Sequence, residues 1–434
     1  MNSSIVAILL SSVFIFIFNF IYAHSNCKKI TLVYYIIILL VTAFSIYFFF
    51  RGRAAIIAAF VNIFYLIYYS RLNFSKKKFA KTAVVLILII TIVFFFQKKD
   101  SSNGRLLIYK VVFTELKAKD YILGLGFGKF KVQYNQLQAS YFKKHYSNNK
   151  DVMLAGNGYY LFNDWLQFVL EIGLIKLLII GCTLAFFSIF LHWQPRNKKL
   201  LFAIDGTLIC ISVAAFFSYP LQVPIILFLF LTCLFLHCFY SYSFKKSNNT
   251  KYARFFLTAN ISGIILIGIP YLILVHQYKL KSNLAFELYR DGFKQKADSI
   301  FTRLSKYPFA DYNTCYNHAY LLFFKNDLNS SLIQINKALT LAYSTEGVKL
   351  KANILTELNK LNEAEHYYIQ AIYITPNRMI PKFNLLQFYL KNNQLLKAKY
   401  WAYDICNMTV KVPSTTTLNI QYQAKNILLQ LKSN

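Results

Sequence analysis

Acidic residues are scarce in this chain: 17 Asp and Glu stand against 48 Lys and Arg, giving a formal net charge of +31. In a soluble protein this imbalance would suggest a nucleic-acid partner. However, 56% of the residues are hydrophobic and the mean hydropathy is +0.40, which is too apolar for a soluble protein of this size. The cations gather in short loops, as the positive-inside rule requires of cytoplasmic loops. We therefore expect no nucleic acid and place three loops in the cytoplasm: Arg71–Lys81, Pro195–Lys199 and Phe244–Arg254.

Cysteines with metal-ligand spacing are also missing. The seven cysteines form no CxxC pattern, so the sequence predicts no metal site. Four of them fall in apolar runs, where a small packing residue is the simplest interpretation, while Cys315 and Cys406 could form a disulfide. Ionisable residues are nearly absent from the apolar runs as well. Asp205 and Glu171 lie near run ends, which argues against a transporter.

Apolar runs of membrane-spanning length recur along the chain, where a bilayer core asks for roughly 20 residues per helix and ~17 at the lower end. The first run could be a signal peptide, but Met1-Asn2-Ser3 supplies no Lys or Arg before it. We expect an all-α, polytopic membrane bundle of about eight spans. The runs are Ser4–Ala23, Ile30–Phe50, Ala54–Tyr69, Thr82–Phe96, Gly173–Phe190, Leu200–Tyr219, Val223–Tyr242 and Phe255–Val275.

These spans and the basic loops divide the chain into four regions. Residues 1–97 and 173–276 are expected to hold the membrane helices, residues 98–172 an external loop, and residues 277–434 an external domain. A connection as long as the loop is usually functional. Arg51 and Arg53 fall in a short external turn, and cations kept where the topology disfavours them are candidates for function.

Small residues repeat in the external domain. Ala285, Ala319, Ala352 and Leu386 recur at intervals of 34, 33 and 34 residues, and twelve residues after each stand Ala297, Ser331, Ala364 and Ala398. Pro376 closes the third unit, and Ser414–Lys432 is predicted to be a closing helix. The spacing resembles the tetratricopeptide repeat, so we expect a helical solenoid with a protein or peptide partner. A generic helical domain with this spacing by chance is the alternative.

The external loop has three parts. Ser101-Ser102-Asn103-Gly104-Arg105 predicts a turn before a helix over Leu106–Lys117. The motif Gly124-x-Gly126-x-Gly128 then breaks the chain, because glycine accepts positive φ and lets backbone N–H groups approach a ligand. Two stretches rich in aromatic residues, Gln133–Phe142 and Leu161–Leu170, are amphipathic and expected at a membrane interface.

Taken in order, the motifs of the loop resemble those of a known family. They are Arg-Gly-Arg-Ala, Ser-x-x-Gly-Arg-Leu-Leu-Ile-Tyr, Gly-Leu-Gly-Phe-Gly-x-Phe, Gln-Ala-x-Tyr-Phe and Asn-Asp-Trp-Leu-Gln-x-x-x-Glu-x-Gly. This order resembles the O-antigen ligase and polymerase superfamily over about Arg51 to Leu191. The form with appended tetratricopeptide repeats is similar to proteins of the Bacteroidetes. Family members usually carry several more helices before Arg-Gly-Arg, so we expect the N-terminal half to be missing here.

The resemblance implies a C-type glycosyltransferase of the bacterial inner membrane that works at the periplasmic face, with periplasmic repeats and without metal or other cofactor. Such enzymes move a glycan from undecaprenyl diphosphate to a sugar hydroxyl of lipid A–core or a growing polysaccharide. Arginine suits the diphosphate because its guanidinium binds phosphate bidentately. Family arginines of this role map onto Arg53 and Arg105, with Arg51 as a neighbouring candidate. Anchoring to membrane lipid headgroups is the alternative for each.

A base must also activate the acceptor hydroxyl. Many family members have a histidine, often as His-Asn, in the segment that matches Asn157–Leu166, whereas this chain has Phe162-Asn163. Asp164 can substitute, because apolar surroundings move a carboxyl pKa toward neutrality, or it can cap the helix Trp165–Ile172. The residues expected to bind substrate are Arg51, Gly124, Gly126, Gly128, Asn157 and Asn163.

A function of another class stays open: a non-catalytic membrane anchor that displays a periplasmic repeat scaffold to other envelope proteins. The missing histidine and the short N-terminal region favour the scaffold. Arg53, Arg105 and the glycine motif favour the transferase. The sequence does not choose between ligase and polymerase, because both use the same carrier chemistry.

Overall fold

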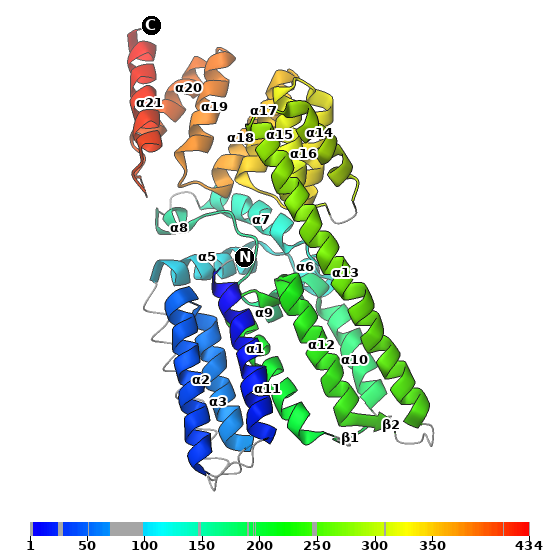
Figure 1. The fold of residues 1–434 in the computed structure, drawn as a ribbon. Helices are drawn as coiled ribbons and strands as arrows, with labels where there is room; N and C mark the ends of the chain where they lie inside the picture. Colours follow the sequence, from blue (N-terminus) through cyan, green and yellow to red (C-terminus); the bar gives the residue numbers. More distant parts are fainter. Residues whose placement is uncertain are drawn as a thin grey trace. The chain divides into compact units, whose positions relative to one another are not determined.

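The computed structural model describes residues 3–24, 29–50, 52–69, 99–145, 149–188, 191–193, 195, 197–244, 250–307, 310–410 and 412–433. They form two compact units (Figure 1), each drawn from separate stretches of the chain. The bundle unit takes residues 1–102, 122–124 and 160–274. The solenoid unit takes residues 103–121, 125–159 and 275–434. The predicted loop 98–172 is therefore divided between the two units.

Apolar helices make up most of the bundle unit. Its elements are α1 (Ser3–His24), α2 (Lys29–Phe50), α3 (Arg53–Tyr69), α9 (Asp164–Ile172), α10 (Leu174–Ser188), β1 (Leu191–Trp193), α11 (Lys198–Phe217), the 3-10 turn η1 (Pro220–Gln222), α12 (Pro224–Ser241), β2 (Tyr242–Phe244) and the first part of α13 (Thr250–Arg290). Helix α11 packs against α1, α3 and α12 (Figure 1). The core therefore lies around α11.

Small residues let these helices approach closely. A Cβ added at Gly52 would lie 2.5 Å from the Cβ of Ala7, and one at Gly206 would lie 2.0 Å from Nδ2 of Asn19. Asn19 Nδ2 in turn donates to Oδ1 of Asn62 over 3.1 Å in the buried interior. Close contacts at small residues and hydrogen bonds between buried amides are typical of helix packing within membranes.

Fewer helices than expected are long enough to cross a membrane. Among the described residues three qualify, α1, α11 and α12, and a fourth would if α9 and α10 formed one span. Those two are bent by 102° at a break, where Gly173 has a φ of +84°. Helix α3 has 17 residues, or about 25 Å against a hydrocarbon core of ~30 Å. The eight expected spans are thus not found in this part of the chain, and Thr82–Phe96 lies outside it.

A pair of short strands bears on the predicted topology. Strands β1 and β2 pair antiparallel, with Leu191 opposite Phe244 and Trp193 opposite Tyr242 (Figure 1). Strand β1 lies before the basic loop Pro195–Lys199, and β2 ends where the basic loop Phe244–Arg254 begins, so the pairing joins the chain segments next to these two loops. Their common cytoplasmic side stays a prediction. The third basic loop, Arg71–Lys81, lies outside the described residues.

The regular elements of the solenoid unit are all helices among its described residues. Its elements are α5 (Lys99–Glu115) and α6 (Ala118–Leu123), which also reach into the bundle unit, α7 (Phe130–Lys144), α8 (Asn149–Leu154), the end of α13, α14 (Lys294–Ser305), α15 (Tyr312–Phe324), α16 (Leu328–Leu341), α17 (Thr345–Glu357), α18 (Leu361–Ile374), α19 (Met379–Lys391), α20 (Leu395–Cys406) and α21 (Thr415–Ser433). Helix α5 begins before Ser101, so the turn predicted over Ser101–Arg105 is wrong.

The predicted repeat is confirmed. Helices pair as α15 with α16, α17 with α18 and α19 with α20, and each pair packs against the next (Figure 1). All eight small or apolar repeat positions are fully buried, from Ala285 to Ala398. Ser331 Oγ donates to the carbonyl of Ala319 over 2.7 Å, which joins the two helices of one pair. Burial against a neighbouring helix is the physical reason for the small side chains.

Left-handed residues repeat with the same period. Gly292, Asn326, Asn359 and Asn393 end the first helix of each pair, and their φ values are 91°, 62°, 58° and 55°. After Asn359 the Lys360 N–H donates to the carbonyl of Leu355 over 2.9 Å, which closes the helix end in a Schellman motif. Only glycine and asparagine reach this backbone region at low cost. These positions are a sequence signal of the repeat that our sequence analysis missed.

The solenoid-bound segment, residues 125–159, contains α7. Helix α7 packs against α16 and α18 of the same unit. Its aromatic side chains Phe130, Tyr134, Tyr141 and Phe142 are buried, with at most 1% exposed. Since protein covers these rings, the expectation that this stretch faces a membrane interface is wrong for α7.

Candidate active site

The predicted site residues fall in both units. Arg53, Gly124, Asn163 and Asp164 belong to the bundle unit, whereas Arg105, Gly126, Gly128 and Asn157 belong to the solenoid unit. Arg51 lies outside the described residues. Asn163 and Asp164 stand together at the start of α9, and this end of the helix is the candidate active site, whereas Gly124 packs against the other end of α9, at Ile172 and Gly173.

Asp164 is the first residue of α9, and only 2% of its surface is exposed. Its Oδ2 accepts a hydrogen bond of 2.7 Å from the backbone N–H of Leu221 in η1. Its other oxygen, Oδ1, is buried and makes no hydrogen bond of ordinary geometry among the described residues, although the Gln222 side chain also donates toward this carboxyl. A buried carboxylate oxygen without a donor is costly, so it marks a place where a ligand hydroxyl can bind.

Asn163 is the N-cap of α9. Its Oδ1 accepts from the backbone N–H of Leu166 over 3.0 Å, and its backbone is extended. The cap that the sequence suggested for Asp164 is thus made one residue earlier. The Asp164 carboxyl is therefore not the cap of α9, and its observed structural contact is the hydrogen bond from the Leu221 N–H. Substrate binding by Asn163 itself stays a prediction, since its side chain is engaged at the helix start.

Aromatic rings lie next to this carboxylate in the chain. Tyr160 stacks on Tyr219 with ring centroids 4.1 Å apart and planes within 7°, and Phe162 meets Tyr219 edge-on at 5.4 Å. Phe162 has a φ of +60°, which is rare for a bulky side chain and strained. Flat aromatic surfaces beside a carboxylate suit a sugar, which has an apolar ring face and a rim of hydroxyls. Of these rings, only Phe162 stands out in the sequence, as the residue at the place of the family's histidine.

Two backbone segments pack tightly against each other at the C-terminal end of α9. A Cβ added at Gly173 would lie 2.3 Å from the backbone nitrogen of Gly124, and one at Gly124 would lie 2.4 Å from the carbonyl carbon of Ile172. Lys176 Nζ also donates to the carbonyl of Leu123 over 3.0 Å. Gly124 therefore packs two chain segments together, which explains this glycine without a ligand.

The predicted positive φ of the glycine motif is confirmed at all three positions. Gly124, Gly126 and Gly128 have φ values of 82°, 94° and 71°. A Cβ at Gly128 would meet nothing within 4 Å, so its need for glycine is conformational. Gln133 Nε2 donates to the carbonyl of Leu125 over 3.2 Å and holds this turn against α7. A ligand at Gly126 and Gly128 stays a prediction.

The two predicted arginines stand on different elements. Arg53 is half-buried at the start of α3, and Arg105 is half-buried on α5. Burial raises the pKa of Tyr109, one turn further along α5, and the charge of Arg105 partly offsets this rise. Diphosphate binding by both arginines stays a prediction.

Asn157 is bound to the solenoid. Its Oδ1 accepts from the backbone N–H and the hydroxyl of Thr345 over 3.1 and 2.9 Å, and its Nδ2 donates to Glu346 Oε2 over 2.9 Å. Both polar atoms of the side chain are thus used at the start of α17. This contact accounts for the asparagine as a structural residue, and its expected role in substrate binding stays a prediction.

An ion pair joins three helices of the solenoid unit. Asp151 Oδ2 accepts from Lys110 Nζ over 2.6 Å and from Tyr141 Oη over 2.7 Å. The hydrogen bond to Asp151 raises the pKa of Lys110 to about 12. Burial favours the neutral carboxyl, but the bonds from Lys110 and Tyr141 outweigh it and lower the pKa of Asp151. The cluster fixes α5, α7 and α8 to one another and leaves Asp151 ionised.

A polar group also bridges the apolar helices of the bundle unit. Asp205 on α11 accepts from Tyr65 Oη over 3.1 Å through Oδ2, and its Oδ1 lies 2.6 Å from His237 Nδ1 on α12. The partners of Asp205 could not be predicted from the sequence, because they are 140 and 32 residues away. Paired ionisable side chains are the usual way to keep such groups among apolar helices.

The six cysteines of the described residues are all free thiols. Cys315 and Cys406 are free thiols, so the disulfide that they could have formed is absent. No group of three or more His, Cys, Asp and Glu side chains is placed to hold a metal ion within the described ranges.

No family model matches the chain, and no curated protein matches it. Among solved structures, the crystal structure of the yeast Tom70 matches with 14% sequence identity and a TM-score of 0.31, over 88% of this chain and 82% of that chain. A TM-score this low carries no argument about fold or function. The helical-repeat fold stated above rests on the packing and burial of this chain's own residues.

Proposed function

We propose that this protein is an O-antigen ligase-like glycosyltransferase of the bacterial inner membrane. It moves a glycan from undecaprenyl diphosphate to a hydroxyl of lipid A–core or of a growing polysaccharide. The motif order from Arg51 to Leu191 supports the class, and one structural observation supports the chemistry: the buried Asp164 carboxylate with an unbonded Oδ1. The apolar helices support a membrane location. The basic loops in the sequence are the reason to propose that the repeats lie in the periplasm.

The reaction needs a base and a charge partner. The acceptor hydroxyl oxygen forms a bond to the anomeric carbon, the bond from that carbon to the diphosphate oxygen breaks, and the hydroxyl proton passes to the base. In our proposal Asp164 Oδ1 takes the proton, because Oδ2 is held by the Leu221 N–H and the carboxylate cannot turn away. In the proposal the stacked Tyr160 and Tyr219 carry a sugar ring. Stabilisation of the departing lipid diphosphate is the role that the family resemblance gives to Arg53 and Arg105.

A second function is favoured by a different observation. In the solenoid unit, the segment that should contain the catalytic loop is bound to the repeats, with Asn377 Nδ2 donating to the carbonyls of Met153 and Ala155 over 3.1 and 2.9 Å. Asn157 is bound in the same way to Thr345. A segment fixed like this suits a non-catalytic anchor that displays a rigid periplasmic scaffold.

The two functions separate in a complementation experiment. The gene is deleted and replaced with the wild type, Asp164→Asn, Arg105→Ala or the matched control Asp291→Asn, in an exposed turn, and the envelope glycans are compared on a gel. We expect Asp164→Asn to lose at least about 100-fold of the transferred glycan, because the amide accepts from Leu221 but takes no proton. The control should restore the wild-type ladder.

Three outcomes would correct the proposal. A full ladder with Asp164→Asn removes Asp164 as the base, and a full ladder with Arg105→Ala removes the diphosphate role of that arginine. A deletion strain whose surface glycans are all unchanged removes the transferase altogether and leaves the scaffold. Protein level in the membrane is measured for each variant, so that loss of folding is not counted as loss of chemistry.

A further inference from the structure

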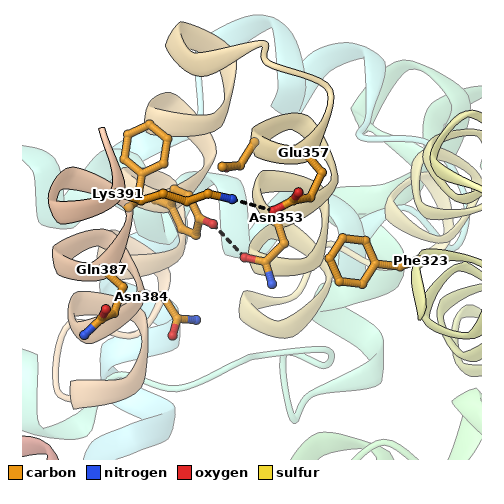
Figure 2. Close-up of a pocket in the computed structure, with 9 residues that line it drawn as sticks. Phe323, Asn353, Glu357, Asn384, Gln387 and Lys391 are labelled. Atoms are coloured by element: carbon orange, nitrogen blue, oxygen red, sulfur yellow. Dashed lines mark hydrogen bonds and ion pairs between the residues drawn. The ribbon is translucent and has the colours of Figure 1, made fainter. Parts of the chain in front are cut away.

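The solenoid unit contains a pocket on the side formed by the first helices of its pairs. It has a volume of about 330 Å³ and lies between α17 and α19, with the end of α15 at one edge (Figure 2). The volume is at the lower end of the range of small-molecule sites, so the pocket fits one small unit of a ligand. Its lining residues are Phe323, Asn353, Thr356, Glu357, Tyr368, Asn384, Gln387, Phe388 and Lys391.

The charges of the pocket cancel. Lys391 Nζ lies 2.9 Å from Glu357 Oε1, and the two are the only charged residues in the lining (Figure 2). A phosphate or a carboxylate would need a cation that is free to pair with it. Because the pocket's one cation already faces a carboxylate, the geometry favours a neutral ligand over an anionic one.

Carboxamides supply the remaining hydrogen bonds. Asn384 and Gln387 lie one turn apart on α19, where residues three apart share a face, and no hydrogen bond of either side chain is found within the described residues (Figure 2). Asn353 Oδ1 accepts from Tyr368 Oη over 2.7 Å, which fixes the amide and presents its NH₂ group. Each amide offers a donor and an acceptor side by side, a match for neighbouring hydroxyls.

Aromatic carbon completes the lining. Phe388 is buried in the wall with 3% exposed, and Phe323 lies at the opposite edge from Lys391 (Figure 2). A sugar has an apolar C–H face and a hydroxyl rim, so it satisfies both the rings and the amides. An extended peptide would instead need a groove that runs across several repeats, longer than this pocket.

We propose that this pocket binds one neutral sugar unit of a glycan. The inference rests on the proposed transferase function, since that reaction supplies the glycan: the repeats then hold the donor or acceptor chain away from the reacting bond. In this arrangement Asn353, Asn384 and Gln387 bond the hydroxyls, while the Lys391–Glu357 pair closes one end.

Binding is tested on the full chain in lipid nanodiscs by saturation-transfer NMR and calorimetry. The probes are neutral hexose and N-acetylhexosamine disaccharides, a uronic-acid disaccharide, and an uncharged ten-residue peptide. We expect the wild type to bind a neutral disaccharide, and Asn384→Ala with Gln387→Ala to weaken it about tenfold or more through two lost hydrogen bonds. Asn329→Ala, an exposed amide on α16 outside the pocket, should bind as the wild type does.

Several results would overturn the proposal. They are wild-type binding to none of the disaccharides, preference for the acidic sugar or the peptide, and unchanged binding in the double variant when circular dichroism shows a folded chain. Failure of the proposed transferase function would give a different set of results from failure of the pocket proposal. Asp164→Asn lies in the bundle unit and should keep sugar binding while losing transfer, whereas a double variant that keeps sugar binding and full transfer refutes the pocket alone.

Discussion

Two neighbouring stretches of the chain differ in whether all of their buried polar atoms have hydrogen-bond partners. In the solenoid-bound segment, residues 125–159, no buried side-chain nitrogen or oxygen of the described residues lacks a partner. Gln138 Nε2, for example, donates to the carbonyls of Gly156 and Ile374. In the bundle segment, residues 160–173, Asp164 keeps an unbonded Oδ1 and Phe162 keeps a strained backbone.

Buried polar groups with and without hydrogen-bond partners have opposite effects on stability. Satisfied buried amides specify one arrangement of the chain and add stability. An orphaned carboxylate oxygen and a left-handed phenylalanine both cost free energy, and such costs persist mainly where function requires them. Of these two stretches, residues 160–173 therefore suit the proposed chemistry better, whereas residues 125–159 are held by hydrogen bonds to the repeats.

The largest expected effect is at the tight backbone contact of the bundle segment. Gly173→Ala should cost roughly 3 kcal/mol or more, because it adds left-handed strain to a clash with the Gly124 nitrogen. Gly128→Ala, in the solenoid-bound segment, has a similar φ and open space, so it should cost only about 1–2 kcal/mol. Thermal unfolding of the detergent-solubilised chain compares the two. Equal losses would show that the contact at Gly173 contributes nothing beyond φ.

The next effect tests the solenoid-bound segment. Asn157→Ala removes three hydrogen bonds to α17 and leaves the Thr345 groups without their acceptor, at a cost of about 2 kcal/mol. Hydrogen exchange of residues 149–159 should rise, while exchange in α9 should stay unchanged. If protection in residues 149–159 is unaffected, the segment is not held by the repeats, and the contrast between the stretches fails.

A smaller effect is expected at the left-handed asparagines. Asn359→Ala should destabilise the solenoid unit by about 1 kcal/mol, since alanine reaches a φ of 58° only with strain, and Asn359→Gly should be nearly neutral. The measurement is chemical denaturation followed by circular dichroism. An alanine variant as stable as the glycine variant would show that the turn relaxes to another conformation.

The smallest effect concerns pH. Burial lowers the pKa of His318 below its ordinary 6.5, partly offset by Asp298, which lies 3.0 Å from Nε2. The unfolded chain then binds a proton that the folded chain does not, so the contribution is full above about pH 6.5 and declines as pH falls toward the folded pKa. His318→Gln should shrink the fall in melting temperature between pH 7 and pH 5. If the melting temperature of His318→Gln falls by as much as that of the wild type between pH 7 and pH 5, other titrating groups cause the fall.

Much of the solenoid could be predicted from the sequence. The spacing of Ala285, Ala319 and Ala352 sets which side chains face the neighbouring helix, and helical periodicity makes that a local property. The number of membrane spans could not be predicted so well. Hydropathy adds up apolar residues without regard to where a backbone break such as Gly173 ends a helix.

The candidate site was only partly predictable. Asp164 was identified by its neighbours in the chain, but its release from capping depends on Asn163 taking the cap. Tyr160 and Tyr219 stack on each other although they are far apart in sequence, so no local sequence pattern predicts this contact. The same is true of the pocket on α17 and α19, whose amides come from two repeats.

What the sequence by itself determined is the local framework: apolar helices, the helical repeat and the positive φ of the glycine motif. Each depends on residues within one or two helical turns or on a regular period. Only the tertiary structure decided the partners of the polar side chains. Asn157 bonds to Thr345, which is 188 residues away, while Asp164 Oδ1 bonds to no described residue. Whether a buried polar atom is satisfied depends on every segment that folds around it, and that is a property of the packed chain.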